Sequence, residues 1–216
     1  SLFLVNRLRD VPEAMGLPPV EEYRGDKTGI HAAGSLDAKH PIKDILFKHI
    51  LRNRTIWFLS IANFFVYLVR YGAMDWAPTY LVEVKGSTIA NASFKTSLLE
   101  FLGIAGSLLA GWVSDKFFPK NRSIINVAYM ALLIFAVLGF WLAPAHSPIL
   151  DATLLGAVGF LVYGPQMMVG VCAAEAAGKQ AAGTANGMTG LFGYMGSIIS
   201  GVGTGYVVER FGWSGG

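Results

Sequence analysis

One arginine lies in the middle of an apolar segment, where a charged side chain is costly. Arg70 is at the centre of NFFVYLVRYGAMDW, within an apolar stretch from about residue 56 to 82. An arginine at bilayer depth costs at least about 2.5–3.5 kcal/mol, so it normally faces a protein interior or a watery cavity. Helical spacing places Asn63 and Tyr67 on its face. Because a planar guanidinium beside a phenol suits bidentate binding of phosphate or carboxylate, we expect all three residues to line an anion-binding cavity.

A glutamate in the next apolar stretch offers a competing role for Arg70. Glu100 is the only acidic residue well inside the stretch 94–113. A rise of about 1.5 Å per residue puts it at a depth comparable to that of Arg70, so the two could simply pair and hold two helices together. We favour an anion-facing Arg70. Both roles can alternate if Glu100 occupies Arg70 when substrate is absent.

Two further tyrosines are candidate cavity residues. Tyr163 precedes Gly164-Pro165 in GFLVYGPQMMVG, and a proline inside a helix removes a backbone hydrogen bond and kinks the helix. Such a bend can serve a gate or be purely structural. Tyr194 lies in the glycine-rich segment 184–205, where small residues permit close helix packing and relative movement.

The segment GWVSDKFFPKNR at 111–122 carries an aspartate and basic residues at the end of an apolar stretch. Asp115 could pair at a helix terminus, whereas Lys116 and Arg122 would anchor the segment at the membrane surface. The segment is either part of a gate or an ordinary solvated loop. We expect ion-pair or gating roles for these three residues and no contact with a substrate.

Catalytic and metal chemistry finds no support in the sequence. It contains no HExxH motif, paired-histidine metal site, Walker phosphate loop or nucleophile elbow. The four histidines fall in loops, where a solvated side chain is the ordinary state. We therefore expect no enzyme activity, no cofactor and no metal.

Composition identifies the elements that must position these residues. Of all residues, 53% are hydrophobic and 14% charged, whereas soluble domains carry about 25% charged residues. A helix needs about 20 apolar residues to cross about 30 Å of hydrocarbon. The apolar stretches that approach or exceed this length are 56–82, 94–113, 123–143, 150–174 and 184–208. The sequence predicts an all-α membrane protein with five complete spans.

The distribution of lysine and arginine predicts the orientation of the spans. If the spans alternate, thirteen of the seventeen basic residues fall on one side and three on the other, and nine of the thirteen lie in 7–54. The positive-inside rule places the richer side in the cytoplasm. The sequence pI of about 9.0 therefore reports topology, and no nucleic-acid partner is expected.

The chain before the first complete span divides into two parts. We interpret residues 1–6 as the end of a truncated transmembrane helix and 7–55 as a cytoplasmic central loop that ends in an amphipathic helix. Residues 56–216 would form a C-terminal bundle that lacks a sixth span, so the chain is expected to be a fragment. Two six-helix halves joined by a long cytoplasmic loop describe the major facilitator architecture, whose substrates bind near the midplane.

Four segments resemble the organophosphate:phosphate antiporters of that superfamily, and the likeness covers nearly the whole chain. They are RDVPEAMGLPPVEEY, IANFFVYLVRYGAMDWAPTYLVEVKG, GFLVYGPQMMVG and KQAAGTANGMTGLFGYMG. The resemblance implies alternating-access exchange of an organic phosphate for inorganic phosphate across the bacterial inner membrane. It favours glycerol-3-phosphate, with hexose phosphate and phosphoglycerate as alternatives. The chain would correspond to the end of span six, the central loop and spans seven to eleven.

The resemblance also implies roles for single residues. Arg70 matches the arginine that the C-terminal half contributes to a two-arginine site, and its partner would belong to the missing N-terminal half. Tyr67, Tyr163 and Tyr194 match tyrosines of the family's cavity, and Glu100 matches its intramembrane glutamate. The complete protein is expected to be a monomer in the lipid bilayer. Some members of the superfamily instead sense an external sugar phosphate and signal to a kinase, and this alternative stays open.

Overall fold

The computed structural model describes residues 16, 18, 50–118, 121–144, 147–178 and 181–216. The chain divides into the units Ser1–Lys39 and His40–Gly216, and the helices described below belong to the second. The span end expected at 1–6 lies outside the described residues. So does nearly all of the loop expected at 7–55, including most of its amphipathic helix.

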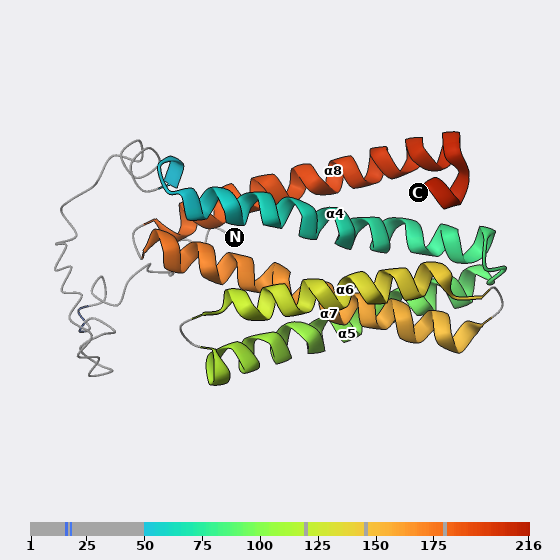
Figure 1. The fold of residues 1–216 in the computed structure, drawn as a ribbon, viewed down its shortest axis with the longest axis horizontal. Helices are drawn as coiled ribbons and strands as arrows, with labels where there is room; N and C mark the ends of the chain where they lie inside the picture. Colours follow the sequence, from blue (N-terminus) through green and yellow to red (C-terminus); the bar gives the residue numbers. More distant parts are fainter. Residues whose placement is uncertain (1–15, 17, 19–49, 119–120, 145–146, 179–180) are drawn as a thin grey trace. The chain divides into compact units, whose positions relative to one another are not determined.

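Within the described ranges, five helices are long and apolar enough to cross a membrane. They are α4 (Arg54–Glu83), α5 (Ile89–Phe117), α6 (Ser123–Leu142), α7 (Pro148–Ala177) and α8 (Ala182–Gly215), as Figure 1 shows. The prediction of an all-α membrane protein with five complete spans is confirmed. At most of their ends the helices run beyond the expected apolar stretches, because polar residues and glycines continue the helical backbone.

Local sequence accounts for several helix ends. The Asn53 side chain accepts a hydrogen bond from the Thr55 amide at 3.0 Å, which caps the start of α4. The same side chain donates to the Ala176 carbonyl oxygen at 3.1 Å and so ties this end of α4 to the end of α7. Helix α7 starts at Pro148, where no amide donor is needed. It stops before Gly178, whose φ of +75° suits glycine.

Helices α5 and α7 touch through glycines. A Cβ atom added at Gly106 on α5 would overlap the carbonyl oxygen of Phe160, and one added at Gly159 on α7 would overlap that of Leu99. The two backbones therefore meet without intervening side chains, as small residues allow inside membranes. This contact fixes the rotation and the axial position of α7 against α5.

Helices α4 and α8 form a second close contact. A Cβ atom added at Gly196 would overlap the carbonyl oxygen of Phe64, and the Ser200 hydroxyl donates to the Leu68 carbonyl oxygen at 2.8 Å. Only part of the glycine-rich segment takes part, because an added Cβ would meet no neighbour within 4 Å at Gly187, Gly190 and Gly201. Glycine density therefore does not by itself mark the contact face of α8.

Large apolar side chains are exposed along all five helices. Examples are Phe65 on α4, Phe101 on α5, Phe135 on α6, Ile149 on α7 and Ile198 on α8. In water such a surface would favour aggregation, whereas lipid tails accommodate it. The exposure agrees with a multi-pass membrane protein.

Candidate functional site

Arg70, Glu100 and Tyr163 meet in one polar cluster inside the bundle, which we call the arginine cluster. Nη2 of Arg70 donates a hydrogen bond to the hydroxyl oxygen of Tyr163 at 2.6 Å, and this hydroxyl donates to Oε2 of Glu100. Nη2 of Arg70 lies 3.8 Å from the same carboxylate oxygen, too far for a direct hydrogen bond. The phenol thus bridges the two charged groups, and α4, α5 and α7 each supply one member.

The position of Tyr163 depends on a glycine of α5. A Cβ atom added at Gly103 would lie 2.6 Å from the Tyr163 ring, so only glycine leaves room for this aromatic ring. The guanidinium carbon of Arg70 lies 4.4 Å from the centre of the Tyr163 ring and 5.3 Å from that of Tyr71. Aromatic faces at these distances attract a guanidinium and hold it in place.

Arg70 is incompletely satisfied by the described residues. Its side chain is 15% exposed, yet its Nε is a buried donor without a hydrogen-bond partner among them. Oε1 of Glu100 is likewise buried and unpaired there. Leaving a buried polar group unpaired costs about 1–3 kcal/mol, and more for a charged group. The arginine cluster can therefore accept an acceptor-rich ligand that uses the spare guanidinium donor.

Aromatic residues of α4 and α8 lie beside the arginine cluster. The Tyr67 hydroxyl accepts a hydrogen bond from Nε2 of Gln166 at 3.2 Å. The Tyr67 ring packs edge-on against Tyr194 with the ring centres 5.7 Å apart, and Tyr194 is 59% exposed. Sequence reasoning missed Gln166. Its signal was available, because a lone amide follows Tyr163 by three residues on an apolar helix and so shares its face.

Asn63 lies apart from Arg70 despite their common helical face. Its side chain is 5% exposed, and Nδ2 donates to the Thr189 carbonyl oxygen of α8 at 2.8 Å. No hydrogen bond connects it to the arginine cluster among the residues with described positions. The structure places Asn63 at the contact between α4 and α8, and its role in the anion site stays a prediction.

The charged residues at 111–122 form a separate cluster near the C-terminal end of α5. Nη1 of Arg122 lies 2.7 Å from Oδ1 of Asp115, and its Nε lies 3.1 Å from Oε1 of Glu175 at the end of α7. Lys116 instead lies over the Trp112 ring, 4.7 Å from its centre. Arg122 thus links α5 to α7 outside the arginine cluster. Glu175 was not foreseen, because its sequence separation from Arg122 gives no sign of the contact.

A cavity of about 470 Å³ lies elsewhere, among α4, α6, α7 and the end of α8. Its wall is mostly apolar and includes Trp76, Tyr80, Trp141 and Trp213. At this end of α8 the helix is interrupted at Gly212, with φ +69°, and the chain turns back, so that Trp213 to Gly216 line the cavity (Figure 1). No residue of the arginine cluster lines it, so this space is not the anion site.

Comparison with known proteins agrees with the helical architecture. The sequence profile described as Major Facilitator Superfamily matches residues 1–201. The chain is 46% identical to a glycerol-3-phosphate transporter from Bacillus subtilis and 43% identical to a probable hexose phosphate transport protein from Chlamydia pneumoniae. It is also 41% identical to a membrane sensor protein from Escherichia coli. Each alignment covers 100% of this chain and 49% of the relative, so the chain spans about half the length of these curated relatives.

Proposed function

Because the chain belongs to the major facilitator superfamily, we propose that it forms the C-terminal half of an antiporter. The antiporter exchanges an organic phosphate for inorganic phosphate, and Arg70 binds the phosphate group that both substrates share. The observation that carries the proposal is the incomplete satisfaction of Arg70. Among the described residues its guanidinium has one neutral hydrogen-bond acceptor and a carboxylate at 3.8 Å, and its buried Nε has no partner.

A phosphate dianion matches these spare donors. Hydrogen bonds between a guanidinium and an oxyanion are about twice as strong as neutral ones, and an environment of low dielectric strengthens them further. The missing half would supply a second arginine on the other side of the phosphate. The binding energy gained by closing both halves around the anion can then favour the interconversion of inward-open and outward-open states.

Glu100 acts in this scheme as the internal substitute for substrate. When the site is empty, Tyr163 connects Arg70 to Glu100 and lowers the cost of the buried cation. An arriving phosphate displaces this interaction and separates Arg70 from the other two groups. Substrate binding therefore changes the contact between α4 and the pair formed by α5 and α7.

For the organic substrate we propose glycerol-3-phosphate, with hexose phosphate and phosphoglycerate as alternatives. The support is the similarity to a relative named a glycerol-3-phosphate transporter, while relatives named hexose phosphate transport proteins and a phosphoglycerate transporter protein also align with the chain. We further propose the bacterial inner membrane as the location, with residues 7–55 in the cytoplasm and a monomeric complete protein.

The test of the phosphate site is Arg70→Lys in the full-length protein reconstituted into proteoliposomes. Lysine keeps the charge but loses the planar fork. We expect phosphate counterflow to fall about ten- to a hundredfold, the effect of one charge-assisted hydrogen bond. Arg210→Lys is the matched control, because Arg210 is exposed on α8. Near-normal counterflow by the Arg70 variant would reject the proposal.

A sensor is the second candidate, because the Escherichia coli membrane sensor protein aligns with the whole chain at 41% identity. A sensor would bind the same phosphate at Arg70 but signal through contacts on its cytoplasmic side. Uptake of labelled glycerol-3-phosphate by cells expressing the full-length protein identifies a transporter. Induction of a reporter by external sugar phosphate without uptake identifies a sensor.

A further inference from the structure

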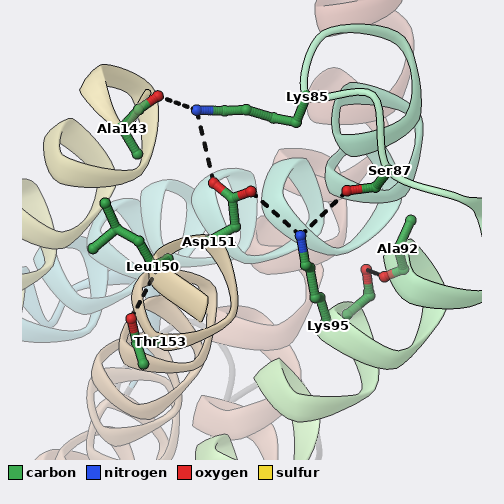
Figure 2. Close-up of polar contacts among 9 residues, drawn as sticks. Lys85, Ser87, Ala92, Lys95, Ala143, Leu150, Asp151 and Thr153 are labelled. Carbon is green, nitrogen blue, oxygen red and sulfur yellow. Dashed lines mark hydrogen bonds and ion pairs between the residues drawn. The ribbon is translucent and has the colours of Figure 1, made fainter. Parts of the chain in front are cut away.

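Two lysines and one aspartate form a buried group near the starts of α5 and α7 (Figure 2). The Arg122 contacts lie near the opposite ends of these two helices. Nζ of Lys95 lies 3.3 Å from Oδ2 of Asp151, and Nζ of Lys85 lies 3.7 Å from Oδ1 of the same carboxylate. The three side chains are between 1% and 5% exposed. We call these residues, with the cavity beside them, the lysine pocket.

The lysine pocket contains more positive than negative charge. Lys85 and Lys95 face a single carboxylate, and their remaining bonds run to neutral acceptors, the Ala143 carbonyl oxygen and the Ser87 hydroxyl. No second acidic side chain contacts either ammonium group among the residues whose positions the structure describes. A buried charge without a partner costs several kcal/mol. The excess cation therefore calls for an anion.

Both ammonium groups keep donor capacity for such an anion. Each has three protons. Among the described residues Lys95 donates to two acceptors and Lys85 to one, so at least one donor remains on each ammonium group. Oδ1 of Asp151 also makes no hydrogen bond within the described chain. A purely structural ion pair would be better satisfied with one lysine than with two.

Two helix N-termini add positive potential at the lining of the lysine pocket. Helix α5 begins at Ile89 and α7 at Pro148, so two helix N-termini border the lysine pocket. Each contributes about half an elementary charge of positive sign. Two helix C-termini also lie near Lys85. Helix α4 ends at Glu83, and α6 ends at Leu142, where the carbonyl oxygen of the C-cap residue Ala143 accepts a hydrogen bond from Lys85.

The cavity has space and an opening for a ligand. Its volume is about 260 Å³, whereas a water molecule takes about 30 Å³ in the liquid, so a tetrahedral oxyanion with several waters fits. Lys85, Lys95 and Asp151 lie at its buried side. Thr88 and Asn91, which also line it, are exposed and mark the side open to solvent.

We propose that the lysine pocket binds a phosphate-type anion, separately from Arg70. The anion is either free phosphate or the phosphate headgroup of an anionic lipid, since both offer the oxygens that the two ammonium groups lack. Asp151 sets the affinity, because its carboxylate competes with the anion for both lysines. The site does not depend on transport, and it remains whether or not Arg70 binds substrate.

The experiment measures binding of labelled inorganic phosphate to the full-length protein in phosphatidylcholine nanodiscs, on an Arg70→Gln background that removes the central guanidinium. Lys95→Gln leaves Lys85 and Asp151 as a neutral pair, so folding is retained, and we expect about ten- to hundredfold weaker binding. Asp151→Asn removes the competing carboxylate, and we expect tighter binding. Arg210→Gln removes an exposed positive charge on α8 and should change nothing.

A second arm identifies the source of the anion. Native mass spectrometry of protein extracted from phosphatidylglycerol nanodiscs shows whether a lipid is retained and whether Lys95→Gln releases it. Phosphate binding that weakens with Lys95→Gln and tightens with Asp151→Asn supports a site for free phosphate, and lipid retention with the same dependence supports a headgroup site. The proposal is overturned if neither ligand depends on Lys95, or if both substitutions weaken binding and lower thermal stability alike, as a structural ion pair would require.

Discussion

Replacing Glu100 by glutamine should make phosphate bind more tightly and exchange more slowly. Glutamine preserves the shape of the side chain and can still accept the hydrogen bond from Tyr163, but it removes the negative charge 3.8 Å from Nη2 of Arg70. In the proposed cycle this charge competes with substrate for Arg70 and helps to expel it. The variant therefore separates affinity from turnover, which a simple loss of structure would not do.

The magnitude follows from the distance and the exposure. Two unit charges 3.8 Å apart attract by about 4 kcal/mol at an effective dielectric of 20 and by about 1 kcal/mol in bulk water. The Glu100 side chain is 38% exposed, so solvent screening brings the energy towards the lower value. We adopt about 1–2 kcal/mol, which corresponds to roughly 5- to 30-fold tighter phosphate binding.

The assay combines equilibrium phosphate binding to the full-length protein in nanodiscs with counterflow in proteoliposomes. Glu209→Gln is the matched control, because Glu209 is exposed on α8 and removing its charge leaves the arginine cluster intact. We expect the Glu100 variant to bind more tightly and to exchange several-fold more slowly than the control. Unchanged affinity together with unchanged exchange would refute the reasoning, and weaker binding would show that Glu100 supports substrate rather than competing with it.

Three other substitutions test the geometry around the arginine cluster and the helix contacts. Tyr163→Phe removes the phenol between Arg70 and its carboxylate, so exchange should fall about tenfold while thermal stability in detergent changes little. Gly106→Ala should lower the free energy of unfolding by about 3 kcal/mol, the upper end of the usual overpacking cost, because its Cβ would overlap the α7 backbone. Gly190→Ala, with no neighbour within 4 Å, should leave stability equal or up to about 1 kcal/mol higher; equal losses for both glycines would contradict the packing described.

The number and type of the spans could be predicted from sequence because the bilayer imposes a minimum apolar length. The approach of Arg70 to Glu100 could also be anticipated, since the rise per residue fixes the depth of each along its helix. The bridging position of Tyr163 could not. It depends on the rotation of α7 against α5, which the glycine contact at Gly106 and Gly159 decides.

Residues on one helical face need not share an environment. Asn63 and Arg70 point in the same direction, but two turns of helix separate them, and at the level of Asn63 the neighbour is the Thr189 carbonyl oxygen of α8. The burial of Lys85 and Lys95 was equally hidden. The count of basic residues places both lysines outside the spans, where solvent would surround them. In the structure both ammonium groups lie against Asp151 and are buried.

The two glycine contacts join four of the helices into two pairs, α5 with α7 and α4 with α8. Within α5–α7 and within α4–α8, backbone rests on backbone, and separating either pair would open a gap too narrow for lipid or water to fill. Between the pairs, the polar connections described near Arg70 run through side chains: the Tyr163 phenol bridges Arg70 and Glu100, and Gln166 donates a hydrogen bond to Tyr67. Contact between the pairs is thus made by side chains, whereas the glycine contacts within each pair are made by backbone. In the proposed cycle, an anion that takes Arg70 away from Tyr163 would break a contact between the pairs and leave the backbone contacts within each pair intact.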